Sequence, residues 1–133
     1  MDQFLRLVST GDGPLQGWTK DPDWRGWIPV LSSSFRSDAP VSYGSSSGAR
    51  EVPKEISVSV KSEDLDVARL YQWAARATPA TATFDFVPDA VGKEGWSLIL
   101  RGAYVTSVKT LGNLTTFSLN FSEKEFRYLL RFR

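Results

Sequence analysis

Two successive apolar stretches give the clearest pattern in this sequence. Residues 96–108 and 116–121 are rich in aliphatic and aromatic side chains, and a short polar break separates them. Runs of β-branched and aromatic residues between turn residues are typical of β-strands. The pattern predicts two neighbouring strands joined by a turn.

Alternation of apolar and polar residues marks further strands. It extends over residues 56–60, 81–86 and 126–132. Because a period of two places the apolar side chains on one face of a strand, each stretch is predicted to be a half-buried strand. Arg127 and Arg131 lie on the predicted outer face of the last one.

Turn residues interrupt the first third of the chain. Residues 3–8 form a predicted first strand, which the Gly and Pro residues of 11–14 end. A second strand is predicted over residues 25–31, and its Pro29 favours an edge, where another chain could pair. The Ser- and Gly-rich stretch of about residues 37–53 is predicted to be a long flexible loop.

One stretch changes to a helical period. Apolar residues within 67–74 recur at i, i+3, i+4 and i+7, which places them on one face of a helix. We expect a helix over about residues 63–78, capped by Ser62 or Asp64 and ended by Pro79.

About seven or eight strands with one helix predict a mainly β fold, an antiparallel β-barrel with the helix against one end. The 133 residues, of which 41% are hydrophobic, are enough for one core. We therefore expect a single domain over residues 1–133.

The composition excludes several kinds of chemistry. The chain contains no His and no Cys, which removes the imidazole base, thiol nucleophiles, disulfides and zinc thiolate sites. Catalysis by carboxylates alone would need acids that converge on one pocket, and the acids here are scattered over turns and charged stretches. We expect no enzyme activity, no cofactor and no metal site.

The balance of charge is nearly neutral. Sixteen basic residues against 15 acidic ones give a net charge of +1, so no overall field favours nucleic acid. The sequence has no apolar run that is long enough to cross a membrane as a helix, and its start does not resemble a signal peptide. We expect synthesis in the cytoplasm without membrane insertion.

The order of the predicted elements resembles that of a known family. The residues that carry the resemblance are Phe4-Leu-Arg-Leu7, Trp27-Ile-Pro-Val-Leu-Ser32, the Ser/Gly loop, residues 56–61, the helix, residues 98–108 and Phe117-Ser-Leu-Asn-Phe121. They are similar to the haemolysin-coregulated protein (Hcp) family, the tube proteins of bacterial type VI secretion systems, which are akin to phage tail-tube proteins. The resemblance spans nearly the whole chain and rests on order and spacing.

The resemblance implies a two-sheet β-barrel that assembles into homo-hexameric rings. Stacked rings would form a tube with a spike protein at its tip, a surrounding sheath and effector proteins in its lumen. It further implies export from the bacterial cytoplasm through the type VI apparatus, without a signal peptide. The turn over residues 11–24 and the short loop after Val108 differ from the usual family pattern, which marks a divergent member.

Several residues are candidate contacts between subunits or rings. Trp18 and Trp24 lie in a turn rich in Pro and Asp, where a large ring favours an interface. Tyr43 and Ser46 lie in the long loop, which could become ordered against a neighbouring ring. The basic residues Arg127 and Arg131 could pair with acids of a neighbouring subunit.

Three further residues are candidate lumen or loop contacts. They are Ser107, Lys109 and Asn113, which lie at and after the end of the first apolar stretch. An alternative interpretation is a small monomeric β-barrel binding module, whose Trp-rich turn binds carbohydrate or peptide.

Overall fold

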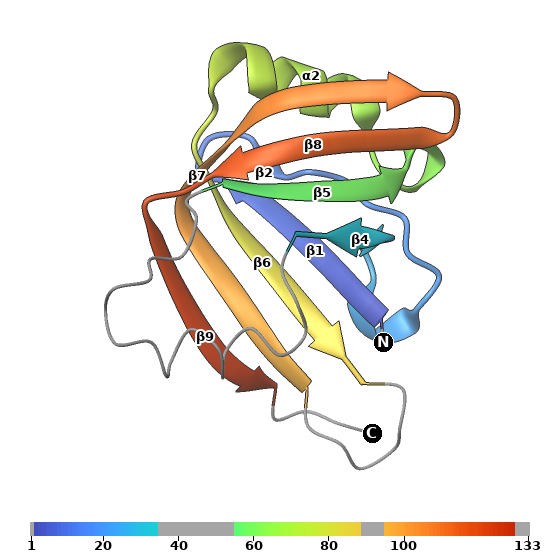
Figure 1. Ribbon diagram of the computed structural model, residues 1–133, viewed down its shortest axis with the longest axis vertical. Helices are drawn as coiled ribbons and strands as arrows, with labels where there is room; N and C mark the ends of the chain where they lie inside the picture. Colours follow the sequence, from blue (N-terminus) through green and yellow to red (C-terminus); the bar gives the residue numbers. More distant parts are fainter. Residues whose placement is uncertain (1, 35–54, 89–94, 130–133) are drawn as a thin grey trace.

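The computed structural model describes residues 2–34, 55–88 and 95–129. In this part of the chain, antiparallel strands dominate and one α-helix, α2 (Val67–Arg76), lies against them (Figure 1). This confirms the predicted fold class. The strands are β1 (Asp2–Ser9), β2 (Gly13–Pro14), β3 (Ile28–Val30), β4 (Ser32–Ser33), β5 (Glu55–Lys61), β6 (Ala80–Val87), β7 (Gly95–Leu111), β8 (Leu114–Asn120) and β9 (Glu123–Leu129).

The strands form two sheets that share the long strand β7. In the first sheet, β2 and β3 pair with β1, and β6, the first half of β7 and β9 follow. The second sheet contains the second half of β7, then β8, β5 and β4. The predicted strand at residues 96–108 therefore corresponds to β7, which joins both sheets, and the one at residues 116–121 corresponds to β8 of the second sheet.

The chain bends between the two halves of β7 at Gly102. This residue has a φ of 63°, and a Cβ at this position would collide with Oγ of Ser122, which lies between β8 and β9. Only glycine meets both requirements without strain. As a result, β8 and β9 follow the same side of β7 around the bend, and each pairs with a different half of it.

Residues 28–33 connect the two sheets on the opposite side. In β3, Pro29 lies opposite Phe4 of β1, and in β4, Ser32 lies opposite Ser59 of β5. The pairings thus lead from β1 through β6, β7, β8 and β5 to β4, and the chain itself connects β4 to β3, which pairs with β1. The strand predicted over residues 25–31 begins only at Ile28, because Gly26 adopts a turn conformation with a φ of 87°.

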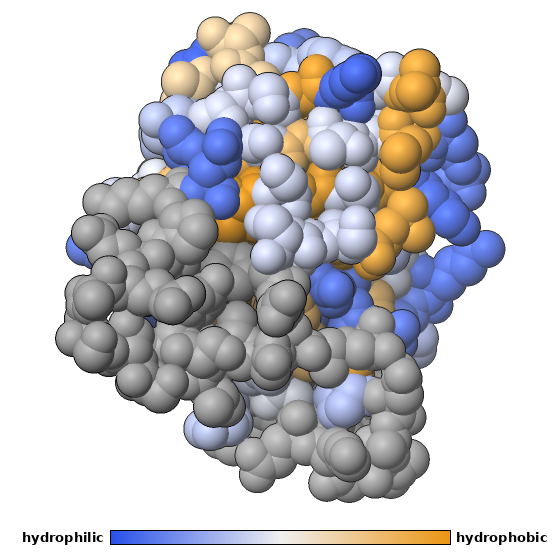
Figure 2. All heavy atoms as spheres, viewed as in Figure 1, coloured by the Kyte–Doolittle hydropathy of each residue, from blue (hydrophilic) through white to orange (hydrophobic). Residues whose placement is uncertain are grey.

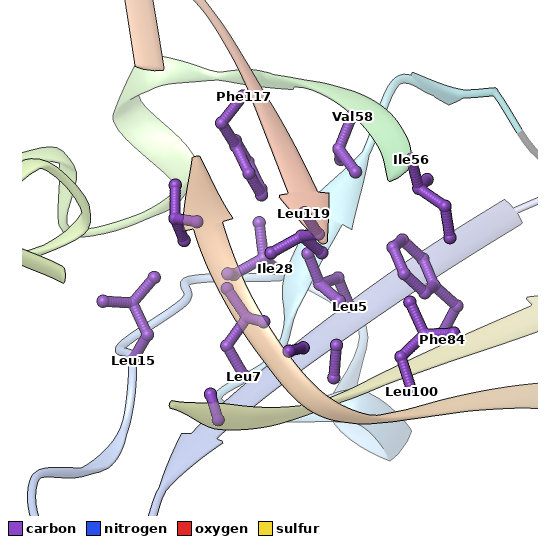
Figure 3. Packing of buried hydrophobic residues seen from close by; sticks show 14 of the residues in the cluster. Leu5, Leu7, Leu15, Ile28, Ile56, Val58, Phe84, Leu100, Phe117 and Leu119 are labelled. Atoms are coloured by element: carbon purple, nitrogen blue, oxygen red, sulfur yellow. The ribbon is translucent and has the colours of Figure 1, made fainter. Parts of the chain in front are cut away.

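The main core lies between the two sheets. Alternate residues of β1, β5, β6, β7 and β8 point inward and meet side chains from the opposite sheet (Figure 3). Truncating one such side chain to alanine typically costs about 2–5 kcal/mol. The fully buried members include Leu5, Ile28, Val58, Phe84, Leu100 and Phe117.

The helix is shorter than the sequence predicted. Residues Ser62–Asp64 form the 3-10 helix η2, and Leu65 is extended with a φ of −153°. Leu65 is buried and forms a β-bridge with Gly17, which interrupts a continuous helix from residue 63. The N-cap is therefore Asp66, whose carboxylate accepts a hydrogen bond from the Arg69 N–H, and the predictions of Ser62 and Asp64 were wrong.

The buried face of α2 also differs in two residues from the prediction. Leu70 is buried as expected, but Tyr71 of the predicted face is exposed, and Trp73, which the spacing left off that face, is buried against the core. The chain leaves α2 through Ala77, which has left-handed backbone angles of φ 51° and ψ 45°.

The final strand begins earlier than predicted, at Glu123, because β9 continues directly from β8 around the bend. The predicted loop at residues 37–53 lies entirely outside the described residues, as do residues 130–133 at the end of the predicted last strand. A second 3-10 helix, η1 (Pro22–Trp24), follows the Gly-rich turn near the start of the chain.

Candidate functional site

Four large exposed side chains lie around the turn between β7 and β8. Leu111 and Leu114 flank this turn and are 72% and 43% exposed, while Trp18 and Tyr71 are 51% and 42% exposed. We call these four residues the hairpin-end surface; Leu111 and Leu114 lie on the outer side of the hairpin, whereas Tyr71 contacts Thr110 on its inner side. Figure 2 shows apolar atoms at this end of the molecule. Grouped exposed apolar side chains indicate a surface that another molecule covers.

Backbone hydrogen bonds connect the separate parts of the hairpin-end surface through η2. The Trp18 N–H donates to the carbonyl of Asp64 at 3.0 Å. At the start of η2, the Ser62 N–H donates to the carbonyl of Asn113 at 2.8 Å. The segment with Trp18 and the hairpin turn are therefore fixed to the same short helix.

A chain of hydroxyl groups fixes the helix to the same hairpin. The Tyr71 hydroxyl donates to Oγ1 of Thr110 at 3.2 Å, and Thr110 Oγ1 lies 3.1 Å from Oγ1 of Thr115. Thr115 is fully buried, and its hydroxyl lies 2.7 Å from Oγ of Ser62. Because each hydroxyl can both donate and accept, the buried Thr115 hydroxyl is satisfied, and the chain fixes α2 and η2 to the hairpin.

Trp24 occupies a different environment from the one its turn suggested. It is 7% exposed, and its ring stacks on Phe4 with the centroids 4.8 Å apart. Its indole N–H donates to Asp85 on the outer face of the first sheet, and Trp27 packs against the same cluster. Burial within the subunit removes Trp24 from the candidate contacts, whereas Trp18 remains exposed.

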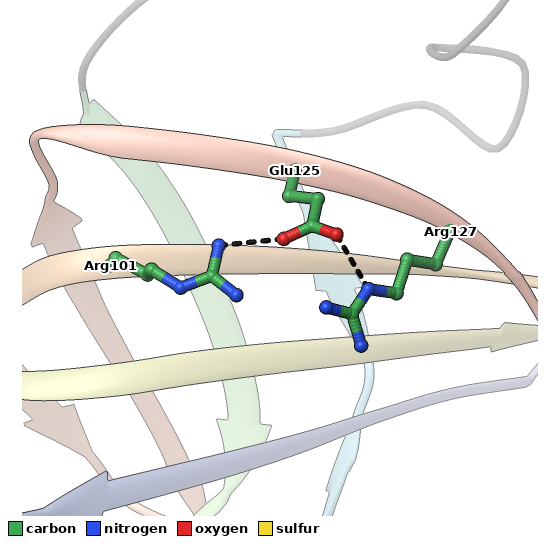
Figure 4. Close-up of polar contacts among 3 residues, drawn as sticks. All are labelled: Arg101, Glu125 and Arg127. Atoms are coloured by element: carbon green, nitrogen blue, oxygen red, sulfur yellow. Dashed lines mark hydrogen bonds and ion pairs between the residues drawn. The ribbon is translucent and has the colours of Figure 1, made fainter.

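Arg127 forms an ion pair within its own chain. Its Nε lies 2.6 Å from one oxygen of Glu125, whose other oxygen lies 2.7 Å from Nη1 of Arg101 (Figure 4). Hydrogen bonds from Arg127 and Arg101 hold the pKa of Glu125 below its ordinary value. All three side chains lie on the outer face of the first sheet, where β9 pairs with β7.

The remaining candidate contact residues are spread over the second sheet, the turn after β7 and the part of the chain that the structure does not describe. Ser107 and Lys109 lie on the outer face of the second sheet, opposite Ser118 and Thr116 of β8. Asn113 is in the turn, where its carbonyl accepts the hydrogen bond from η2. Tyr43, Ser46 and Arg131 lie outside the described residues.

Leu111, Leu114 and Tyr71 were not among the sequence candidates. The two leucines were available from the sequence, because each directly adjoins the Gly112-Asn113 pair of a tight turn. Tyr71 gave no such signal, since its helical spacing indicated the buried face.

The acids near the hairpin-end surface do not form a metal site. Burial raises the pKa of Asp64, and the carboxylate of Glu63 raises it further. Within residues 2–34, 55–88 and 95–129, no three acidic side chains come close enough together to hold a metal ion. The surface is suited to apolar contact with another molecule.

No helix in the described ranges is long and apolar enough to cross a membrane. No protein-family model matches the sequence, and no curated protein matches it either.

Solved structures match the fold over nearly the whole chain. The Hcp1 protein from E. coli EAEC 042 has a TM-score of 0.73 and 14% identity, over 96% of this chain and 90% of that one. Hcp1 from Salmonella typhimurium has a TM-score of 0.69 and 15% identity, over 98% and 88%. A type VI secretion system effector from Yersinia pestis has a TM-score of 0.71 and 12% identity, over 98% and 92%. The chain therefore has the Hcp fold, with a sequence that diverges widely from these proteins.

Proposed function

We propose that this protein is a structural subunit that assembles into hexameric rings, and that these rings stack into the inner tube of a type VI secretion system. The proposal rests on one observation, the match to Hcp structures over nearly the full length of both chains. A role in assembly also agrees with a chain that contains neither His nor Cys.

The hairpin-end surface supports this proposal. A ring that also stacks needs contacts at its sides, which close the ring, and head-to-tail contacts at its two ends, which propagate without closing. Leu111 and Leu114 extend from a hairpin that hydrogen bonds hold in place, so little ordering is needed when they are covered. We propose that this surface, which includes Trp18, contacts a neighbouring copy.

The remaining contacts follow from the same proposal. Tyr43, Ser46 and Arg131 stay candidate contacts between rings or subunits, and Arg127 is a candidate whose charge is already partly balanced by Glu125. Ser107, Lys109 and Asn113 stay candidate lumen or loop contacts. A spike protein, a sheath and effector proteins would be the partners, and the type VI apparatus would export the protein from the bacterial cytoplasm.

The solution mass tests the proposal. Multi-angle light scattering over a concentration series, at low and high salt, should give a hexamer, and electron microscopy should then find ring-shaped particles. The double variant Leu111→Ser, Leu114→Ser should keep its fold but assemble less, so that the measured mass of the particles falls toward that of the monomer. Arg6→Gln is the control, because Arg6 is exposed on the outer face of the first sheet, away from the hairpin. A monomer at every concentration would contradict assembly by this chain alone.

The alternative, a monomeric module that binds ligands with its Trp-rich turn, loses its main support. Trp24 is buried and bonded to Asp85, and Trp27 is half-buried against the same cluster. Only Trp18 of these three indoles is largely exposed, so the turn offers no platform of several rings.

A further inference from the structure

β9 forms a long and regular edge of the first sheet. Among the described strands it pairs with β7 alone, so only one of its two sides takes part in a ladder of hydrogen bonds (Figure 1). Its seven residues include no proline, and its register with β7 has no bulge. The other strands that pair with a single described strand, β2, β3 and β4, have only two or three residues. A regular edge of this length is a template for pairing with another chain.

The two faces of β9 have different side chains. Glu125 and Arg127 lie on the outer face, where they form the ion pair drawn in Figure 4. Lys124, Phe126 and Tyr128 alternate with them on the inner face, and Phe126 packs against the main core. Lys124 is exposed, and Tyr128 is 73% exposed. The strand therefore offers both signs of charge and an aromatic ring to a chain that pairs beside it.

The order of these side chains is complementary to itself in the antiparallel direction. If two copies of β9 pair with Phe126 opposite Phe126, Glu125 of each copy lies opposite Arg127 of the other. On the inner face, Lys124 of each copy then lies opposite Tyr128 of the other. Opposite charges at directly opposed positions stabilise a pair of strands, and so do aromatic pairs. A lysine ammonium is also attracted to the face of a tyrosine ring.

The neighbouring registers lack this complementarity. Directly opposed side chains lie on the same face of a sheet, so a symmetric antiparallel pair is centred on a residue. A pair centred on Glu125 would place two carboxylates opposite each other, and a pair centred on Arg127 would do the same with two guanidinium groups. Like charges at such positions are destabilising. Of these three registers, only the one centred on Phe126 avoids a like-charged pair.

We propose that β9 pairs with β9 of a second copy in antiparallel orientation, with Phe126 at the centre, so that two first sheets become one continuous sheet. Such a contact is isologous, because both copies use the same strand. Neighbours within a cyclic ring make heterologous contacts, so this pairing is distinct from the contacts of the proposed ring. It joins two unassembled subunits or copies from two rings.

Two cysteines test the pairing and its register. The chain has no Cys, so the double variant Lys124→Cys, Tyr128→Cys introduces the only two thiols. In the proposed register, each thiol lies opposite the other position of the second copy. The two Cα atoms are then about 4.5–5.5 Å apart, which is within the range of a disulfide. Two copies of the same position are four residues apart along the strands, roughly 13 Å, which is too far for a disulfide.

The covalent products distinguish this contact from a contact of the ring. After mild oxidation, electrophoresis without reductant should show a dimer and no longer species, because both disulfides form within one isologous pair. Trypsin cleaves after Arg127, so mass spectrometry should find the peptide with position 124 linked to the peptide with position 128. The single variants Lys124→Cys and Tyr128→Cys are the controls, and neither should give a dimer. A ladder of longer species, or links between identical positions, would overturn the proposal.

A charge swap tests the same register through the outer face. Arg127→Glu, added to the two cysteines, places acids opposite each other and should abolish the dimer. Glu125→Arg, added to that variant, exchanges the two charges and should restore the dimer. A dimer that persists in the first variant, or that stays absent in the second, would contradict the proposed register.

The mass of the unmodified chain keeps this inference separate from the proposed function. A chain that forms hexamers but gives no linked dimer would overturn the pairing of β9 alone. A chain that gives the linked dimer but forms no hexamer at any concentration would contradict the proposed function and leave the pairing of β9 in place.

Discussion

The indole N–H of Trp24 donates a 2.8 Å hydrogen bond to Oδ2 of Asp85, a residue 61 positions away in the sequence. Asp85 is buried, and its other oxygen accepts a hydrogen bond from the Ser97 hydroxyl. A buried carboxylate is costly unless such donors surround it. The contact therefore joins η1 to β6 and β7 and fixes the turn to the outer face of the first sheet.

Removing this donor should weaken the fold. Trp24→Phe keeps most of the stacking on Phe4 but leaves one oxygen of Asp85 without the indole N–H, which should lower the free energy of unfolding by roughly 1–3 kcal/mol. Urea unfolding measures this change. The matched control is Trp18→Phe at an exposed position, where a shift within about 0.5 kcal/mol is expected. Equal effects of the two substitutions would contradict the role of the hydrogen bond.

The end of α2 contains backbone strain that glycine should relieve. Ala77 has a φ of 51°, a conformation that costs residues with a Cβ about 1–2 kcal/mol. After the added entropy of the unfolded chain is subtracted, Ala77→Gly should stabilise the protein by roughly 0.5–1 kcal/mol. The same substitution inside the helix, Ala75→Gly, should destabilise it by about 1 kcal/mol. The midpoint temperature of thermal unfolding should therefore rise for Ala77→Gly and fall for Ala75→Gly.

Gly17 lies where a side chain has no room. A Cβ at this position would collide with the carbonyl of Trp27 and would lie 2.7 Å from Cγ1 of Ile28. Gly17→Ala should cost about 1–3 kcal/mol, as is typical of overpacking, in urea unfolding. Gly11→Ala is the control, because a Cβ there meets nothing within 4 Å. If the two variants are equally stable, Gly17 does not lie against Trp27 and Ile28 as closely as described.

Glu125 should make stability depend on pH. Arg127 and Arg101 lower its pKa in the folded state, so the ionised carboxylate favours folding. This contribution is complete above the pKa of glutamate in the unfolded chain, and it is lost as the pH falls through the lower pKa of the folded state. The difference in urea midpoint between the wild type and Glu125→Gln should therefore shrink on acidification through this range. A difference that is independent of pH would show that the carboxylate charge has no part in it.

Charge reversal at the end of the chain tests the proposed contacts of the basic residues. The double variant Arg127→Glu, Arg131→Glu should reduce the mass of the assembly. The two positions would then have the same negative charge as the acids proposed to face them on a neighbouring subunit, and the contact would become repulsive. Far-ultraviolet circular dichroism should stay unchanged, since exposed ion pairs add little to stability. Glu125→Gln serves as the control, because it breaks the ion pair within the chain while Arg127 keeps its charge. An unchanged sedimentation coefficient would remove both arginines from the interface.

Local patterns were sufficient to predict most strands and failed where distant segments meet. The alternation of Ile56, Val58 and Val60 correctly predicted β5, because the period of a strand is a property of neighbouring residues. The start of α2 could not be predicted in this way, since the β-bridge between Leu65 and Gly17 decides it. Trp24 was misplaced for the same reason, because its partners Phe4 and Asp85 lie far away in the sequence.

The sequence by itself determined a mainly β chain with one helix, and its lack of His and Cys excluded whole classes of chemistry. The order of its strands was also enough to indicate the Hcp fold, which the solved structures match. Only the tertiary structure decided which side chains share a face: Leu111 and Leu114 lie with the serines of three strands on the outer face of the second sheet, whereas Tyr71 contacts Thr110 on the inner side of the hairpin. The physical reason is that strand register and the bend at Gly102 set these neighbours, and both depend on packing between segments that are remote in the chain.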